Sequence, residues 1–493
     1  MNIRPAVLCG LLLVSGTLAS CGSRSDPAAE GKPFYLTMGL SLTGELPPKN
    51  NMVEQAIEEY TQTALQIQWI PYSAYEEKVR LMIAAGELPK LIKLGYSPTM
   101  MSTLKSDQFW EIGPYLPEFK ELQAVDRRYY DNISVDGRVY GIPLFRDLGR
   151  AAIQYRKDWF DRLGLELPVT LEDWYRAIRA LTLEDPDGNG RQDTYGLVLE
   201  KRYNQDIGSI LTRISVSQGG PAKWKVENGR FTPEFMTEPF FETMRLFRRL
   251  YQENLINRDF AITDTIETTK MYESGRAGLM LSGGNAQTWQ DMLVKSSPGA
   301  VVDVAPLTGP QGRRLPGEPG NAGFLAIPKD AVKTEDEVKQ ILGFLNRLME
   351  PALQALLING LENRHWSRKD GYAEMLDRTL HHKEVKPYRD MLPHLTEAEA
   401  DWKRNLQPDL YRKNQRIGRE NEAYIVPNPA LTLDSGTYVE RGKELELLIT
   451  DAQTKFIMGK LDEAGWQTEL NKWRQAGGDR MIREYEEAYA KKQ

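Results

Sequence analysis

The sequence predicts an α/β fold built as two lobes, and three observations lead to this prediction. The chain has 493 residues, 41% of them hydrophobic, which is more than one compact core usually holds. Strand and helix patterns alternate from Phe34 onwards, as they do where a parallel sheet is covered by helices. The pattern changes between Arg146 and Arg150 and a second set of strands follows, so we place the first crossing between lobes there.

The first lobe opens with two strand–helix units. Apolar residues alternate with polar ones in the strands and gather on one face in the helices. The pattern gives strand, helix, strand and helix in turn, at residues 34–40, 52–60, 65–69 and 75–85. Gly86 ends the second helix, and an apolar stretch at 88–94 follows. Two such units in succession predict a parallel sheet.

The second lobe contains one helix start that the sequence marks clearly. Thr170 and Asp173 form a capping-box pattern, in which each side chain accepts a backbone N–H left free at the beginning of a helix. A loop rich in Gly and Pro, at 306–321, leads into a further strand and marks the second crossing. The strands expected here and after the loop are at 278–281, 301–304 and 323–328.

From Val338 the pattern is helical, and the chain stays helix-rich and charged to its end. The predicted organisation is a leader, a flexible tether, the first part of lobe 1, the first part of lobe 2, the second part of lobe 1, and the second part of lobe 2 with the C-terminal helices. These segments are 1–20, 21–33, 34–147, 148–308, 309–366 and 367–493.

The first twenty-one residues predict an export signal. Arg4 precedes an apolar run at 6–14, which is about half of the ~20 residues that a membrane span needs. Residues 18–21, Leu-Ala-Ser-Cys, resemble the bacterial lipobox, in which the Cys becomes the lipidated first residue. The alternative is a plain signal peptide that ends beside a Cys. Because Cys9 lies in the leader, Cys21 is the only thiol expected in the mature chain, which excludes an internal disulfide.

Charge and motifs exclude several classes of function. The net charge of −6, with 63 basic and 69 acidic residues interspersed, gives no basic field for nucleic acid. The four His form no zinc motif, and neither a phosphate-binding Gly-rich loop nor a nucleophile elbow occurs. A glycoside hydrolase needs only two carboxylates, so a secreted carbohydrate-active hydrolase stays an alternative. A surface interaction or signalling protein is the other alternative.

Four segments together resemble a known family. They are IAAGELP at 83–89, YRKDWFDRLGL at 155–165, PVTLEDW at 168–174 and GFLAIPK at 323–329. This combination is similar to the extracellular solute-binding lipoproteins of carbohydrate ABC importers, of the family 1 type, and especially to the alginate-binding proteins. Lys90 departs from the family pattern, which commonly has Asp after Leu-Pro, and this puts one loop contact in doubt.

The resemblance implies a two-lobe periplasmic-binding-protein-like fold of class II, with a hinge and a ligand cleft between the lobes. It implies a protein without enzymatic activity that captures an oligosaccharide or other small molecule and delivers it to the permease subunits of an importer. It also implies a monomer held by its lipid anchor on the extracellular face of the bacterial cell membrane. Ligand binding would close the lobes by a hinge motion.

One loop in the second lobe has the pattern of a calcium site. Residues 185–193, DPDGNGRQD, match the first three quarters of an EF-hand loop, and oxygen ligands in a Gly-containing turn suit a possible structural Ca²⁺. The ligands would be Asp185, Asp187, Asn189, the carbonyl of Arg191, and Asp193. Position twelve, where an EF-hand has Glu, is Gly196, and Thr194 stands where the alginate-binding relatives have an acid. The alternative is a turn without metal.

A sugar site combines aromatic rings, which stack on C–H groups, with planar polar groups that bond hydroxyls. Three places combine them: a loop after a strand, a segment near the last crossing, and the first crossing. The candidate residues are Asn285 and Trp289, Arg364 and Trp366, and Tyr140 and Arg146. The resemblance favours the two Trp residues, because relatives have binding aromatics in those loops. Each Trp could instead pack in a core, and each Arg could form a salt bridge across the hinge.

Overall fold

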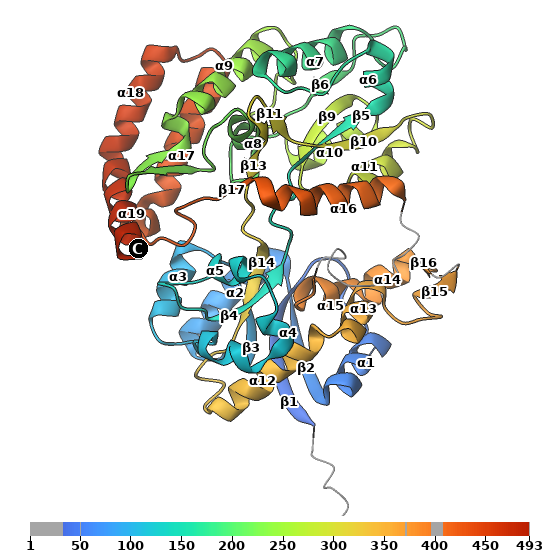
Figure 1. Cartoon of the computed structure of the whole chain (residues 1–493), viewed down its shortest axis with the longest axis vertical. Helices are drawn as coiled ribbons and strands as arrows, with labels where there is room; N and C mark the ends of the chain where they lie inside the picture. The colour runs from blue at the N-terminus through green and yellow to red at the C-terminus, as the bar shows by residue number, and fades with distance from the viewer. Residues whose placement is uncertain (1–32, 50, 370–371, 396–407, 493) are drawn as a thin grey trace, which may run out of the picture.

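The computed structural model describes residues 33–49, 51–369, 372–395 and 408–492. These residues form two α/β lobes, one above the other in Figure 1. Each lobe has its own sheet, covered by helices, and its own buried hydrophobic residues. The predicted fold class, α/β with two lobes and a helix-rich C-terminal region, is confirmed.

The first lobe, at the bottom of Figure 1, has a five-stranded sheet in its centre. Its strands are β1 (Phe34–Leu42), β2 (Thr63–Pro71), β3 (Leu91–Leu94), β4 (Gly141–Phe145) and β14 (Asn321–Ala326). β1 pairs in parallel with β2 and β3, as the two strand–helix units predict. β14 comes from much later in the sequence and lies antiparallel between β3 and β4.

Helices and short turns surround this sheet. In chain order they are α1 (Met52–Thr61), α2 (Tyr72–Ala85), α3 (Pro98–Lys105), η1 (Gly113–Glu118), α4 (Lys120–Gln123), α5 (Arg127–Asp131), α12 (Glu335–Leu348), α13 (Pro351–Asn359), the hairpin of β15 (Trp366–Lys369) and β16 (Tyr372–Met375), α14 (Arg378–Glu384) and α15 (Lys386–Met391). Gly86 ends α2 as expected, because its φ of 68° is a left-handed conformation that glycine adopts without strain.

The second lobe has a four-stranded sheet in the order β10-β5-β9-β6. These strands are β5 (Ala152–Arg156), β6 (Tyr195–Leu197), β9 (Ala277–Ser282) and β10 (Val302–Pro306). The short strands outside this sheet are β7 (Trp224–Glu227), β8 (Arg230–Pro233), β11 (Thr308–Gly309), β12 (Gly312–Arg313), β13 (Leu315–Pro316) and β17 (Ile425–Val426).

The helices of the second lobe come from two stretches of the chain. The first stretch gives α6 (Lys157–Leu163), α7 (Leu171–Leu183), α8 (Ile210–Ser217), η2 (Glu234–Met236), α9 (Glu238–Gln252), α10 (Thr265–Glu273) and α11 (Ala286–Leu293). The second gives α16 (Asp409–Asn421), η3 (Glu422–Tyr424), α17 (Gly436–Ile457), α18 (Glu463–Trp473), η4 (Arg474–Gly478) and α19 (Asp479–Lys492).

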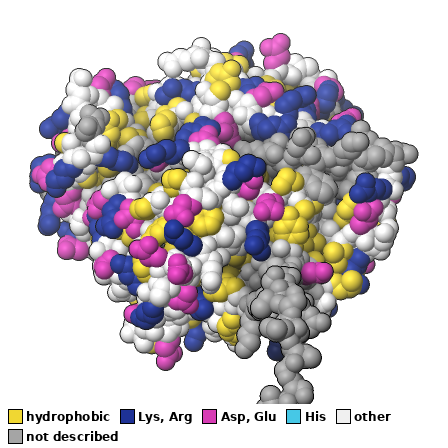
Figure 2. All heavy atoms as spheres, turned by 60° about the horizontal axis from the view of Figure 1, so that its bottom comes forward, with side chains coloured by type: hydrophobic (Ala, Val, Ile, Leu, Met, Phe, Trp, Pro, Cys, Tyr) yellow, Lys and Arg dark blue, Asp and Glu magenta, His cyan; other side chains and the backbone are white. Residues whose placement is uncertain are grey.

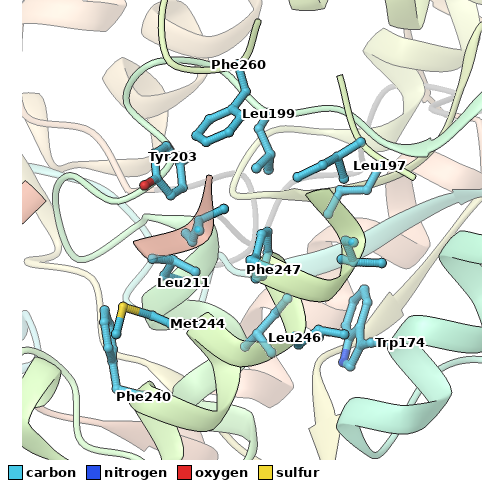
Figure 3. Close-up of a cluster of buried hydrophobic side chains, with 14 of the residues drawn as sticks. Trp174, Leu197, Leu199, Tyr203, Leu211, Phe240, Met244, Leu246, Phe247 and Phe260 are labelled. Carbon is cyan, nitrogen blue, oxygen red and sulfur yellow. The ribbon is translucent and has the colours of Figure 1, made fainter. Parts of the chain in front are cut away.

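The core of the second lobe joins these two stretches. Trp174 on α7 and Phe247 on α9 are fully buried, and Figure 3 shows them among aliphatic and aromatic side chains. Trp466 and Tyr485, on α18 and α19, belong to the same cluster. The C-terminal helices are therefore part of this lobe, and Tyr485 packs edge-on against Trp224.

Two predicted lobe boundaries differ from the structure. Residues 309–316 pack in the second lobe, where Leu315 is fully buried, so the second crossing comes at 317–320. Residues 378–391 still pack on the first lobe, because Tyr388 is buried beside β1 and its hydroxyl donates to Glu54 (2.6 Å). The return to the second lobe therefore lies between Leu395 and α16, and not at residue 367. Charged amphipathic helices look alike in sequence whichever lobe they cover, which is why the pattern misplaced this step.

The first two crossings form a paired hinge. Arg146 N–H donates to the carbonyl of Gly320, and Glu318 N–H donates to that of Leu148, both at 2.9 Å. Segments 146–151 and 317–320 are therefore joined to each other by backbone hydrogen bonds. Asn421, at the end of α16 in the second lobe, also bonds to the first hinge segment. Its side-chain amide donates to the carbonyls of Gly149 and Ala151.

No single helix in the described ranges is both long and apolar enough to cross a membrane. Helices α12 and α13 together pass that test of length and composition but are bent by 67°. The apolar side chains of α12, such as Ile341 and Leu345, are fully buried in the first lobe. On the face that Figure 2 shows, basic and acidic side chains are mixed, as the composition predicts.

Candidate ligand-binding cleft

Two hollows lie where the lobes meet in the described part of the chain. The first, which we call the lobe hollow, has a volume of about 270 Å³. The second lobe lines it with Gln287 and Asp291 of α11, and the first lobe with Arg378, His381 and Arg389 of α14 and α15. Tyr411 of α16 completes its wall. This hollow is therefore formed by side chains from both lobes.

The second hollow, the hinge hollow, has a volume of about 540 Å³ and lies beside the crossings. Arg150 and Glu318 come from the two hinge segments, and Arg213 comes from α8 of the second lobe. Gly283 and Gly284 follow β9 and complete the wall. The loop after β9 thus leads from the hinge hollow directly to α11 at the lobe hollow.

Positively charged side chains gather around both hollows. Burial lowers the pKa of the Arg146 guanidinium, and the charges of Arg150 and Arg389 lower it further, while Asp390 opposes them. Burial also lowers the pKa of Arg213, with Arg150 acting in the same direction. Acidic side chains offset part of this charge, because Glu318 pairs with Arg213 and Asp390 pairs with Arg389.

Three polar atoms at the cleft are buried and have no hydrogen-bond partner among the described residues. They are Nε of Arg213, Nδ2 of Asn285 and Nδ1 of His381. Arg213 lines the hinge hollow, His381 lines the lobe hollow, and Asn285 stands in the loop between them. Six other buried side-chain atoms of the described residues also lack a partner, so these three atoms are donors or acceptors that a ligand or water could complete, and do not by themselves define a site.

Two of the predicted ligand-binding residues lie next to the hollows without lining them, and their role in binding stays a prediction. Arg146 begins the first hinge segment, and its Nη1 donates to the carbonyl of Phe145 (2.8 Å). Asn285 is the N-cap of α11, where its Oδ1 accepts the N–H of Gln287 (2.9 Å). Its amide nitrogen is the unpartnered atom described above.

Two predicted aromatic contacts are instead core residues. Trp289 is 2% exposed, lies edge-on to Tyr272, and donates its indole N–H to the carbonyl of that residue (3.3 Å). Tyr140 is 4% exposed and packs in the first lobe. Neither ring offers a face to a ligand, so the predicted stacking role of both residues is wrong. Trp159 and Trp174 are buried core residues too.

The third predicted pair has a structural role within the first lobe. Arg364 donates twice to the carboxylate of Glu384 (2.8 and 2.7 Å), which also accepts from the fully buried His365 (3.1 Å). Trp366 is half-buried, and its indole N–H donates to the carbonyl of Gly360 (2.9 Å). Neither residue lines either hollow, and the salt bridge of Arg364 lies within one lobe and not across the hinge.

Several cleft residues escaped the sequence analysis. Arg150 lies next to the predicted crossing, so its position alone could have drawn attention to it. Arg213, Arg389, His381 and Tyr411 lie on helices far apart in the sequence, and no local pattern separates them from other helical residues. Only the packing of the two lobes brings them together.

The calcium-like loop forms a compact turn on the second lobe. Gly188 and Gly190 have φ of 70° and 77°, and the Asn189 amide donates to Asp187 (2.9 Å) and Asp193 (3.1 Å). Asp185 accepts the N–H groups of Asn189 (3.1 Å) and Gly190 (3.0 Å). Burial raises the pKa of Asp187, and the neighbouring acids Asp185 and Asp193 raise it further.

The donor set of this loop has the right chemistry for Ca²⁺ but no complete shell. At position twelve, a β-carbon on Gly196 would lie 2.5 Å from the carbonyl oxygen of Ile178, so no larger side chain fits there. Thr194 points inward and donates to the carbonyl of Leu181 (3.0 Å). Among the described residues, no group of three acidic, His or Cys side chains stands close enough to hold a metal ion.

Two hinged α/β lobes with hollows between them define a ligand-binding protein of the two-lobe class. The family described as bacterial extracellular solute-binding protein matches residues 42–347, which is more than half of the chain. The chain belongs to this family.

Curated relatives agree with this assignment over nearly the whole chain. Lipoprotein LipO of Bacillus subtilis (strain 168) is 33% identical over 491 residues, which are 97% of each chain. The polygalacturonan/rhamnogalacturonan-binding protein YtcQ of the same organism is 33% identical over 493 residues, with the same coverage.

Solved structures agree in fold. The HMO-binding, ABC-transporter-associated solute-binding protein from Bifidobacterium longum infantis has a TM-score of 0.72 at 15% identity, covering 94% of this chain and 99% of that one. The alginate-binding protein AlgQ2, solved without calcium ion, has a TM-score of 0.67 at 16% identity, covering 93% and 98%. The predicted relationship to ABC-importer binding proteins is confirmed, and the chain is a binding protein of that class and not an enzyme.

Proposed function

We propose that this protein captures an oligosaccharide between its lobes and delivers it to the membrane permease of an ABC importer. The observation that carries the proposal is the pair of hollows that both lobes line, with buried polar atoms of Arg213, Asn285 and His381 that have no partner among the described residues. Hydroxyl groups of a sugar both donate and accept, so they can complete these bonds. Closure over the ligand would then bring the two halves of the site together.

The lobe hollow contains the side chains that a sugar needs. Tyr411 offers a ring, and Met375 and Ile358 offer apolar surface for the C–H faces. Gln287 and Thr288 offer groups that bond hydroxyls in either direction. The relative YtcQ is a polygalacturonan/rhamnogalacturonan-binding protein and the Bifidobacterium structure is an HMO-binding protein, which supports a carbohydrate ligand.

A thermal-shift screen over neutral and acidic oligosaccharides tests the proposal. A true ligand at 100 times its Kd should stabilise the folded protein by about 2.7 kcal/mol. Asn285→Ala and Gln287→Ala should reduce that stabilisation, whereas Gln467→Ala, on the distant and exposed face of α18, should not. A screen in which no oligosaccharide raises the melting temperature would contradict the proposal.

We further propose that loop 185–193 binds Ca²⁺ weakly as a structural ion. The oxygens of Asp185, Asp187, Asn189 and Asp193, with the carbonyl of Arg191, would hold it, and water would complete the shell. A chelator should then lower the melting temperature without changing which sugar binds. Asp187→Asn should remove that sensitivity, while Asp451→Asn, an exposed acid on α17 paired with Lys455, should keep it. If neither added calcium nor a chelator changes the melting temperature, the proposed ion is excluded.

The location on the cell surface is also a proposal. Family membership places the protein outside the cytoplasm of a bacterium, and Cys21, which lies outside the described residues, would carry the lipid. We propose a monomer tethered by acyl chains to the extracellular face of the membrane, close to its permease. Mass spectrometry of the N-terminal peptide tests this, because Cys21→Ser should abolish the lipid and release the protein into the medium.

A further inference from the structure

The hinge hollow has one positive charge without a counter-ion. Its charged lining consists of Arg150, Arg213, Asp206 and Glu318. Arg213 pairs with Glu318 at 3.2 Å, and the carboxylate of Asp206 lies 2.7 Å from Arg202 outside the hollow. Arg150 donates only to the carbonyl of Gly283 (3.2 Å), and no carboxylate of the described residues lies within ion-pairing distance of it. One further negative charge, supplied by a ligand, would therefore balance the unpaired positive charge of Arg150.

The two arginines approach the same small space. A β-carbon at Gly283 would lie 3.5 Å from Nε of Arg150 and 3.6 Å from Nη2 of Arg213. A β-carbon at Gly208 would lie 3.2 Å from the same Nη2. Because both positions are glycine, no side chain of theirs fills the space beside the two guanidinium groups.

Hydrogen bonds within the protein fix the position of the Arg213 side chain beside the hollow. Its side chain is 8% exposed, its Nη1 donates to the carbonyl of Leu281 (2.7 Å), and its Nε has no partner among the described residues. A guanidinium has five N–H donors in a planar fork that matches the two oxygens of a carboxylate. Glu318 satisfies one corner of this fork and leaves the rest incompletely bonded.

We propose that the hinge hollow is a subsite for a single carboxylate, held by Arg150 and Arg213, and that the ligand is therefore an acidic oligosaccharide. This inference rests on the proposed function and names the chemical class of its ligand. In the structure, Glu318 occupies part of the place of the ligand carboxylate at Arg213. A bound uronic acid would take over Arg213 and give Arg150 its counter-ion.

The position of Glu318 couples this subsite to the hinge. Its backbone N–H is bonded to Leu148 on the other hinge segment, while its side chain reaches Arg213 of the second lobe. A ligand carboxylate that displaces Glu318 therefore releases a bond between the hinge and the second lobe at the moment of binding. A neutral sugar would leave that bond in place.

Calorimetric titration of the full chain with trigalacturonate and with its methyl ester tests this subsite. The two ligands have the same length and differ in charge. We expect the acid to bind at least ~10-fold more tightly, and Arg150→Gln to reduce its affinity by about the same factor, since a charge-assisted hydrogen bond contributes on this scale. Binding of the ester should change by less than about twofold.

Glu318→Gln provides a second readout, with a change of opposite sign. The amide keeps an acceptor for Arg213 but no longer competes as an anion, so the acid should bind roughly 3- to 10-fold more tightly. A residue with only a structural role would instead weaken both ligands. Arg127→Gln removes an exposed positive charge on α5, away from the cleft, and should leave both titrations unchanged.

The outcomes separate the two proposals. Equal binding of acid and ester by the natural chain would overturn the carboxylate subsite and leave oligosaccharide capture standing. Binding of neither ligand, nor of any sugar in the thermal screen, would overturn both proposals. If Arg150→Gln weakened acid and ester equally, Arg150 would be a general contact, and the assignment of the charge to this hollow would be wrong.

Discussion

The ammonium group of Lys105, on α3 of the first lobe, lies 2.8 Å from the carboxylate of Asp434 in the second lobe. Lys105 also lies 3.0 Å from Asp136 of its own lobe. Arg128 repeats this arrangement, with Asp126 at 2.7 Å in the first lobe and Glu422 at 2.9 Å in the second. Each cation thus keeps one partner when the lobes separate, so these pairs favour contact between the lobes without locking them.

The double variant Asp434→Asn and Glu422→Gln tests whether these ion pairs favour contact between the lobes. Exposed ion pairs contribute about 0.2–1 kcal/mol each, so with both pairs removed the ligand should leave roughly 2- to 30-fold faster while association changes little. Stopped-flow measurement of both rates checks this, and high salt should reduce the difference. Asp131→Asn, which breaks an exposed pair within α5, is the matched control. An unchanged dissociation rate would contradict the role of these pairs.

Asn421 should be essential to the hinge. Its side chain is fully buried, and its Nδ2 donates to the carbonyls of Gly149 and Ala151, both at 2.9 Å. Asn421→Ala leaves both carbonyls without this donor, and we expect a loss of about 1–3 kcal/mol in the free energy of unfolding. Denaturant unfolding measures it. Asn414→Ala, which removes one partly buried bond on the same helix, should cost less.

Acid should destabilise the folded protein through His381. Burial lowers the pKa of this imidazole from 6.5 to about 4, and the charge of Arg389 acts in the same direction. Below pH ~6.5 the His381 imidazole binds a proton in the unfolded chain but stays neutral in the folded chain. The free energy of unfolding therefore falls as the pH drops towards 4.

Melting curves of His381→Gln across this range give the check. Gln can still donate to the carbonyl of Ile358, which His381 contacts at 2.8 Å. The loss of stability on acidification should become smaller by on the order of 3 kcal/mol. A slope equal to that of the natural chain would show that other groups account for it, such as His394, whose pKa burial also lowers to about 4.

The capping box of α7 should make stability depend on pH in a lower range than His381 does. Hydrogen bonds from the backbone and the hydroxyl of Thr170 lower the pKa of Asp173 to about 2, from 3.8. A lowered carboxyl pKa gives stability that is present above pH ~3.8 and is lost as pH falls towards 2.

Asp173→Asn should therefore flatten the pH dependence of melting between these values, and Thr170→Ala should cost about 1 kcal/mol at neutral pH. Asp161→Asn, an exposed acid on α6 that pairs with Lys157, is the control. A pH dependence that persists in Asp173→Asn would remove the cap as its cause.

Local patterns predicted the elements of this fold well, because they depend on neighbours in sequence. The alternation around β2, the stop at Gly86 and the Thr170–Asp173 box all appear as expected. Segments decided by packing were harder to assign. Residues 378–391 were assigned to the wrong lobe, since the faces that their apolar side chains cover belong to distant strands.

Local patterns indicated only the neighbourhood of the candidate site. Arg146 and Asn285 stand beside a crossing and at a strand end, next to the hollows, and their role in binding stays a prediction. Trp289 was misjudged because a ring in a loop can turn inward as easily as outward, and here Tyr272 covers it. The pairing of Arg150 with Arg213 depends on two glycines and on the contact between α8 and the hinge, which no linear pattern contains.

The place of β14 in the first sheet has a consequence for synthesis of the protein. β14 lies between β3 and β4, although it follows both by more than a hundred and seventy residues. When a nascent chain has reached β4, the strand that joins it to the sheet has not yet been made. The N-terminal body must therefore wait, incompletely folded, until residue 326 emerges, and such long-range pairing is slow to form. The first sheet is therefore completed only after most of the second lobe has been synthesised.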